Sequence, residues 1–170
     1  MRAYNHFSQL IVDSRIALCM LKDNLNLNNS YFGNYIPVIK EYTADDNIEC
    51  YLHPLALSHI ILLISKLANP NAIKHSSNDI LCILDRAGIK TLQDEVIDAE
   101  YGMEIADVLK RSSDSEQIHF VQAASVVCAV RNKYPLLTAN KNLVGLGAMT
   151  IFIGDNGVQT IYDADGKRLR

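Results

Sequence analysis

Short apolar runs alternate along the chain with longer segments in which apolar residues recur every three or four positions. Each short run ends at a polar residue or a turn, as buried β-strands do. These runs lie at 9–12, 49–52, 89–92 and 135–138. The helical spacing is found at 14–27, 57–68, 76–87, 93–111 and 115–133. Asp114 and Gln117 form a capping signature ahead of the last of these helices. Strands alternating with helices predict an α/β domain with a parallel sheet.

The pattern changes near the end of the chain. Two β runs follow residue 148, and Asp155-Asn156-Gly157 between them is typical of a hairpin turn. We therefore predict a three-layer α/β/α domain with a mainly parallel central sheet and a C-terminal β-hairpin extension. We expect the whole chain, 1–170, to form one domain, with a core at about 9–153 and a hairpin with a basic tail at 154–170.

Composition narrows the classes of function. A net charge of -3 argues against binding nucleic acid by bulk charge, although a local basic groove is compatible with it. The cysteines are far apart and lack metal-ligand spacing, so we expect buried free thiols in a reducing compartment. They are Cys19, Cys50, Cys82 and Cys128. We find no signal peptide pattern and no apolar run of membrane-spanning length, so we expect a cytoplasmic protein without a membrane partner.

Polar side chains follow the predicted strands at one edge of the sheet. Asp13 follows the first strand, and Asn140 follows the strand that contains Thr138. His59 falls in the first turn of the helix after the second strand, and His119 falls in the early turns of the helix predicted at 115–133. Because the carboxyl ends of parallel strands meet at one edge, we expect these side chains to share a pocket.

The order of elements over about 9–153 resembles the PIN domain family, metal-dependent endoribonucleases that include the toxin half of many bacterial toxin–antitoxin pairs. The run LIVDSRIALCML resembles the family's first strand, in which Asp is followed by a small hydroxyl residue. The run HFVQAASVVCAVRNKYPLLTANKNL resembles the family's helix with paired alanines and its strand ending in Thr-x-Asp/Asn-Lys. The acidic and apolar helix at 93–111 also has a counterpart there. The resemblance implies a PIN-like fold that acts on RNA.

The resemblance places the family's acidic site at Asp13, His59, His119 and Asn140, and only the first and last keep a residue type of the family. It implies an altered catalytic site made of these four residues, with Asp13, His59 and His119 as the metal ligands. The ion would be Mg²⁺ or Mn²⁺ by resemblance, or a transition metal such as Zn²⁺ if the imidazoles are ligands. A degenerate site would hold none.

Five further residues complete the predicted site. Ser14 and Thr138 are the supporting hydroxyls, and Lys141, Arg131 and Lys133 are the expected RNA contacts. The ordinary structural readings stay open beside these roles. An Asp before a helix is commonly its cap, an Asn after a strand is commonly a turn residue, and a histidine on an apolar helix is commonly hydrogen-bonded within the fold.

Three hypotheses follow. The first is a probable endoribonuclease, either metal-dependent or using His59 and His119 as general base and acid near about pH 6.5, with Asp13 orienting one of them. The second is an inactive PIN-like binding or scaffold module in a larger complex. Its partners, like those of the enzyme, would be RNA, an antitoxin or other protein, or a second copy. The third, a nucleotide-binding α/β domain, lacks both GxGxxG and GxxxxGK[ST].

Overall fold

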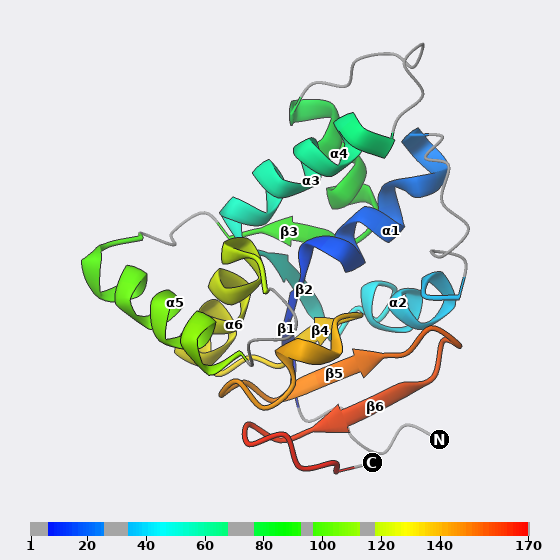
Figure 1. Cartoon of the computed structure of the whole chain (residues 1–170). Helices are drawn as coiled ribbons and strands as arrows, with labels where there is room; N and C mark the ends of the chain where they lie inside the picture. The colour runs from blue at the N-terminus through cyan, green and yellow to red at the C-terminus, as the bar shows by residue number, and fades with distance from the viewer. Residues whose placement is uncertain (1–6, 26–33, 68–76, 93–96, 113–117, 170) are drawn as a thin grey trace.

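A six-stranded sheet runs through the centre of the molecule in the order β3-β2-β1-β4-β5-β6 (Figure 1). The computed structural model describes residues 7–25, 34–67, 77–92, 97–112 and 118–169. The strands are β1 Gln9–Val12, β2 Glu49–Leu52, β3 Ile89–Thr91, β4 Leu136–Thr138, β5 Thr150–Ile153 and β6 Gln159–Tyr162. Neighbouring strands are parallel except β5 and β6, which pair antiparallel. The predicted mainly parallel sheet with a terminal hairpin is confirmed.

Helices cover both faces of the sheet. They are α1 Ser14–Leu25, α2 Ile36–Thr43, α3 Pro54–Leu67, α4 Ser77–Arg86, α5 Ala99–Arg111 and α6 Phe120–Asn132, with a 3-10 turn η2 at Lys141–Leu143. Successive side chains of a strand point to opposite faces. Accordingly Leu10 and Val12 pack in one core with α1 to α4, whereas Ile11 packs in a second core with α5 and α6. Figure 1 shows α5 and α6 on one side of the strands and α1, α3 and α4 on the other.

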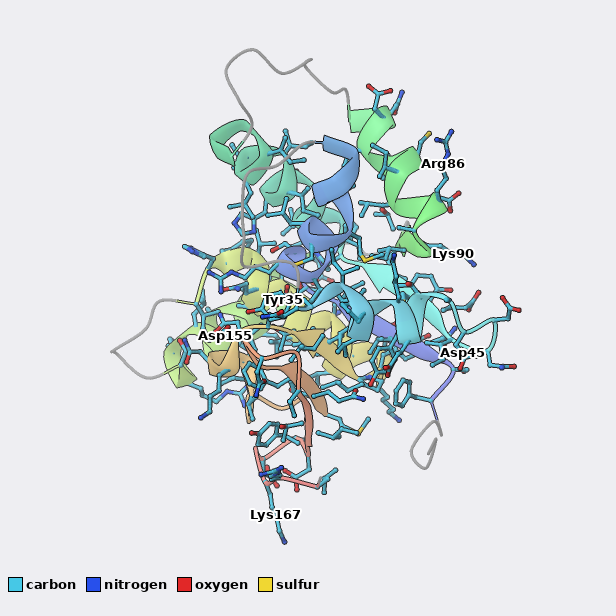
Figure 2. The ribbon with its side chains drawn as sticks, turned by 90° about the vertical axis from the view of Figure 1, so that its right-hand side faces the viewer. Tyr35, Asp45, Arg86, Lys90, Asp155 and Lys167 are labelled. Carbon is cyan, nitrogen blue, oxygen red and sulfur yellow. The ribbon has the colours of Figure 1, made fainter. Side chains whose placement is uncertain are left out.

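The terminal hairpin is hydrogen-bonded to the residues that precede α2. Tyr35 Oη donates to Asp155 Oδ1 at 2.6 Å, and Asn34 Nδ2 donates to the Asp155 carbonyl at 2.8 Å. Figure 2 shows Tyr35 and Asp155 side by side. Gly157 adopts φ +76°, and a Cβ there would meet the Asn34 carbonyl at 2.6 Å, so the turn needs glycine. Partial burial and the Asp155 carboxylate raise the pKa of Tyr35 to about 12.

The structure changes several details of the prediction. Helix α6 begins at Phe120, so His119 is its N-cap and not part of its first turns, while Asp114 and Gln117 lie outside the described residues. Helix α3 begins at Pro54, a residue favoured at the first helical position, which places His59 in its second turn.

The cysteine prediction is wrong at one position. Cys82 is exposed, because α4 turns Ile80 and Leu84 toward the core and Cys82 lies on another side of the same helix. The other three cysteines are buried and form no disulfide bond. None of the described helices combines the length and the apolar character needed to cross a membrane.

Candidate functional site

Asp13 is completely buried where β1 passes into α1. Its Oδ1 accepts hydrogen bonds from the backbone N–H groups of Arg15 at 2.7 Å and Ile16 at 3.1 Å, which makes Asp13 the N-cap of α1. Its Oδ2 is hydrogen-bonded to the hydroxyl of Thr138. Burial raises the pKa of Asp13, although these hydrogen bonds oppose the rise. Asp13 therefore has the structural role of a helix cap.

A chain of hydrogen bonds continues from Thr138 along the edge of the sheet. Thr138 Oγ1 accepts from the backbone N–H of Asn140 at 2.9 Å. The Asn140 side chain accepts from the Asn142 N–H at 3.1 Å and so caps η2. Its Nδ2 donates to Gln122 Oε1 at 3.3 Å. The oxygen and the nitrogen of the Asn140 amide are thus both engaged in the fold.

Gln122 links this chain to His119, and the sequence prediction missed it. Gln122 Oε1 also accepts from the backbone N–H of His119 at 3.3 Å, the reciprocal bond of a capping box. The signal was present in the sequence as an amide three residues after His119. It was not recognised because the helix was predicted to begin earlier, which placed Gln122 in its interior.

The two predicted histidines meet at this edge. The rings of His59 and His119 have centroids 5.8 Å apart and are tilted by 56°. His119 is exposed and His59 is half-buried. Ser14 Oγ lies within hydrogen-bond distance of His59 Nδ1, at 2.8 Å. The structure therefore brings Asp13 and Asn140 into one hydrogen-bonded network with His119, and sets His59 beside it.

His53 is a further buried polar residue at this edge that the prediction did not include. It follows Leu52, which pairs in register with Val12, so His53 and Asp13 leave neighbouring strands at the same level. His53 Nδ1 accepts from the Leu55 N–H at 3.1 Å, and its ring centroid lies 5.9 Å from that of Tyr101. His53 therefore caps α3, as Asp13 caps α1.

The metal site implied by the resemblance is not assembled in the part of the chain that the structure describes. Within the described ranges, no three or more His, Cys, Asp or Glu side chains are placed to hold a metal ion together. Both oxygens of Asp13, one of the expected ligands, are hydrogen-bonded inside the fold.

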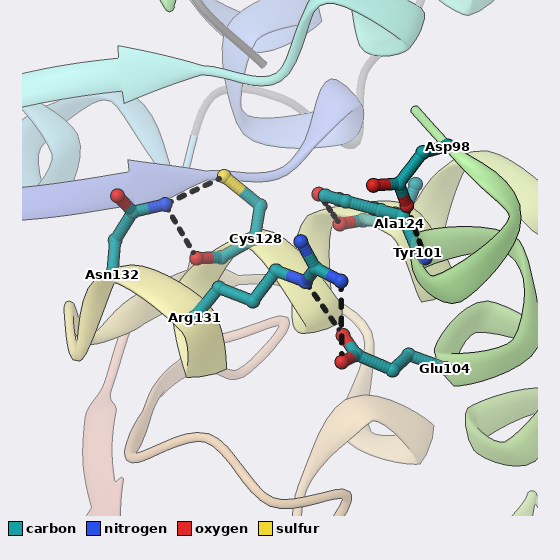
Figure 3. A network of polar contacts seen from close by, with 7 residues as sticks. All are labelled: Asp98, Tyr101, Glu104, Ala124, Cys128, Arg131 and Asn132. Atoms are coloured by element: carbon teal, nitrogen blue, oxygen red, sulfur yellow. Dashed lines mark hydrogen bonds and ion pairs between the residues drawn. The ribbon is translucent and has the colours of Figure 1, made fainter. Parts of the chain in front are cut away.

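The expected RNA contacts are divided between two places. Lys141 is exposed directly after Asn140, at the carboxyl edge. Arg131 and Lys133 lie at the other end of α6, about 18 Å along the helix from His119. Arg131 Nε contacts Glu104 Oε2 at 2.7 Å, and its guanidinium lies 4.5 Å from the centroid of the Tyr101 ring (Figure 3). Arg131 thus joins α6 to α5, and the edge does not gather these two residues with Lys141.

The fold and the edge define a class of protein: a three-layer α/β domain with a mainly parallel sheet and a polar network at the carboxyl ends of its strands. No family model matches the chain, and no curated protein matches it. Among the solved structures that match is the crystal structure of FitAcB from Neisseria gonorrhoeae, at 11% identity and a TM-score of 0.44, covering 79% of this chain and 89% of that one. A likeness at this level carries no functional argument, so function has to come from the site.

Proposed function

We propose that this chain is a PIN-like, RNA-directed protein that cleaves RNA with His59 and His119 as its acid–base pair, without a bound metal ion. The observation that carries the proposal is the pairing of these rings, 5.8 Å apart, at the carboxyl edge of the sheet. One ring is exposed and the other is half-buried, so a substrate can approach from solvent. Ligands of open α/β sheets bind at this edge.

Two imidazoles supply what RNA cleavage needs in the absence of a metal. One takes the proton of a ribose 2′-hydroxyl, whose oxygen forms a bond to the adjacent phosphorus. The bond from phosphorus to the 5′ oxygen breaks, and the other imidazole gives that oxygen its proton. The products are a 2′,3′-cyclic phosphate and a free 5′-hydroxyl. An imidazole can serve either as the base or as the acid, so a pair of them can fill both roles.

The surrounding residues position this pair. The hydrogen bond between Ser14 and His59 orients the ring of His59, a role that the prediction had given to Asp13. Asp13 acts indirectly, because it caps the first turn of α1, which contains Ser14. Gln122 holds the backbone of His119. Exposed Lys141 supplies a positive charge for the phosphate.

A cleavage assay under four conditions tests the proposal. In the first three conditions, single-stranded RNA is incubated with the protein in excess EDTA, with added Mg²⁺, or with added Mn²⁺. In the fourth, the RNA carries a 2′-deoxy nucleotide at the cleaved position. We expect the RNA to be cleaved in EDTA and neither ion to increase the rate. We expect no cleavage at the 2′-deoxy position. Cleavage that stops in EDTA and returns with metal would overturn the metal-free mechanism in favour of the family's own.

A second candidate function is a PIN-like module without catalysis, which acts by binding RNA, an antitoxin or another protein. The observation that favours it is that Asp13 and Asn140, the two positions that keep a residue type of the family, are both used as caps in the fold. In the same assay this module leaves the RNA intact in every condition. It also shows no metal binding by calorimetry.

A further inference from the structure

We propose that Phe120 is a stacking platform for one base of single-stranded RNA, placed beside the histidine pair. The inference rests on the proposed function, because the RNA that it binds is the substrate of that site. It adds a residue outside the acid–base pair and a preference for unpaired bases.

The platform is an exposed aromatic side chain at the start of α6, next to the histidine pair. Phe120 is 50% exposed and directly follows His119. Its neighbour Val121 packs against the core. On the opposite helix, Leu62 is 60% exposed and lies one turn beyond His59, on the same side of α3. Each imidazole therefore has an exposed apolar side chain within one turn of its own position.

Positive charge lies in sequence next to residues that are linked to the pair by hydrogen bonds. Arg15 is exposed next to Ser14, which holds His59, and Lys141 is exposed next to Asn140. A nucleotide offers a flat apolar base at one end and a negative phosphate at the other. The edge offers both kinds of group, because Phe120 follows His119 and the cations adjoin Ser14 and Asn140.

This combination fits an unpaired base. Every base has a face that stacks on an aromatic ring, and such stacking tolerates any sequence. In a duplex both faces of a base are already covered by its neighbours, so Phe120 would reach only bases at an end or in a loop. The net charge of the protein is -3, so bulk attraction contributes little and stacking has to supply much of the affinity.

The chain contains no tryptophan, which allows a direct test. Phe120→Trp places the sole indole at the platform, and Met103→Trp, on the 64% exposed Met103 of α5, is the matched control. The probe is a 2′-O-methyl oligonucleotide, which cannot be cleaved through its 2′ oxygen. We expect the single strand to quench the tryptophan fluorescence of Phe120→Trp, and a duplex or an abasic strand to leave that fluorescence unchanged. The fluorescence of Met103→Trp should not respond to any of the three. Equal quenching by the abasic strand, or in the control, overturns the platform.

Binding of the same labelled oligonucleotide, measured by anisotropy, gives a second reading. We expect Phe120→Ala to weaken binding about tenfold and Phe120→Tyr to preserve it. The loss should vanish on the abasic strand. If Phe120→Ala binds like wild type while wild type still cleaves RNA, the platform is wrong and the proposed function stands. If wild type does not cleave but base-dependent quenching persists, the proposed function is wrong and the platform stands. No response to any oligonucleotide overturns both.

Discussion

The carboxyl edge of this sheet has two halves that treat their polar groups differently. In the buried half, the fully buried Asp13 and Thr138 are joined to each other, to half-buried Asn140 and to backbone N–H groups. In the exposed half, His59 and His119 face each other with one ring open to solvent. Residues at equivalent strand ends therefore have different surroundings. Asp13 and Asn140, which keep residue types of the resembled family, hold the fold, and in our proposal the two histidines perform the chemistry.

The largest expected effect is on catalysis in the exposed half. His119→Ala should slow RNA cleavage by about 10³-fold, because general acid–base groups contribute about that much. The free energy of unfolding of this variant should fall by about 1 kcal/mol or less, since the side chain is exposed and its removal costs at most a helix cap. Single-turnover cleavage and urea unfolding measure the two effects. The control is Lys110→Ala, an exposed residue of α5 that should cleave like wild type. Full activity of His119→Ala would remove His119 from the site.

The next effect is on folding, in the buried half. Asp13→Ala should lower the free energy of unfolding by about 3 kcal/mol, because it removes a helix cap and leaves the hydroxyl of Thr138 and backbone donors without their acceptor. The matched control is Asp98, the exposed cap of α5, which accepts from the Tyr101 N–H at 2.9 Å. Asp98→Ala should cost about 1 kcal/mol. Equal losses in urea unfolding would show that burial adds nothing to the role of Asp13.

A pH series separates charge from hydrogen bonding at the same residue. Burial raises the pKa of Asp13 above its ordinary 3.8, so the folded protein keeps the proton after the unfolded chain has released it. Stability should therefore fall as the pH rises from about 4 to the raised pKa, by up to about 1.4 kcal/mol per pH unit, and then level off. Asp13→Asn lacks this loss. The difference in unfolding free energy, wild type minus variant, should decrease across this range, and a difference that stays flat or increases contradicts the assignment.

The smallest expected effect lies at the far end of α6. Arg131→Ala removes the contacts with Glu104 and Tyr101 and should cost about 1 kcal/mol or less. Because Arg131 is far from the histidines, RNA binding should not change. Lys141→Ala is the contrasting variant and should weaken RNA binding. If both variants weaken RNA binding equally, the RNA-contacting surface extends along α6. The claim that Lys141 contacts RNA and Arg131 does not is then wrong.

The layered fold was predictable because its signal is periodic. Alternating strands and helices predicted the parallel sheet, and Asp155-Asn156-Gly157 predicted the hairpin. Element ends were harder to predict, because they depend on single hydrogen bonds. The start of α6 was placed before His119, since the apolar pattern could not show that the Gln122 side chain closes a capping box there.

The site was predictable in position and less so in role. Parallel strands bring their carboxyl ends together, and this predicted that Asp13 and Asn140 would lie near the histidines. The sequence does not show which oxygens are already hydrogen-bonded, so Asp13 was expected to bind metal. Hydrogen bonds of this kind depend on side-chain geometry and not on spacing. The separation of Arg131 from the edge, in contrast, follows from spacing, because the helix predicted at 115–133 rises by about 18 Å between His119 and Arg131.

The most direct test of the central claim is the pH dependence of single-turnover RNA cleavage in excess EDTA. We predict a bell-shaped profile, and the loss of one limb in His59→Ala and of the other in His119→Ala. A rate that increases steadily with pH and requires added metal ion would contradict the claim that the histidine pair performs the chemistry.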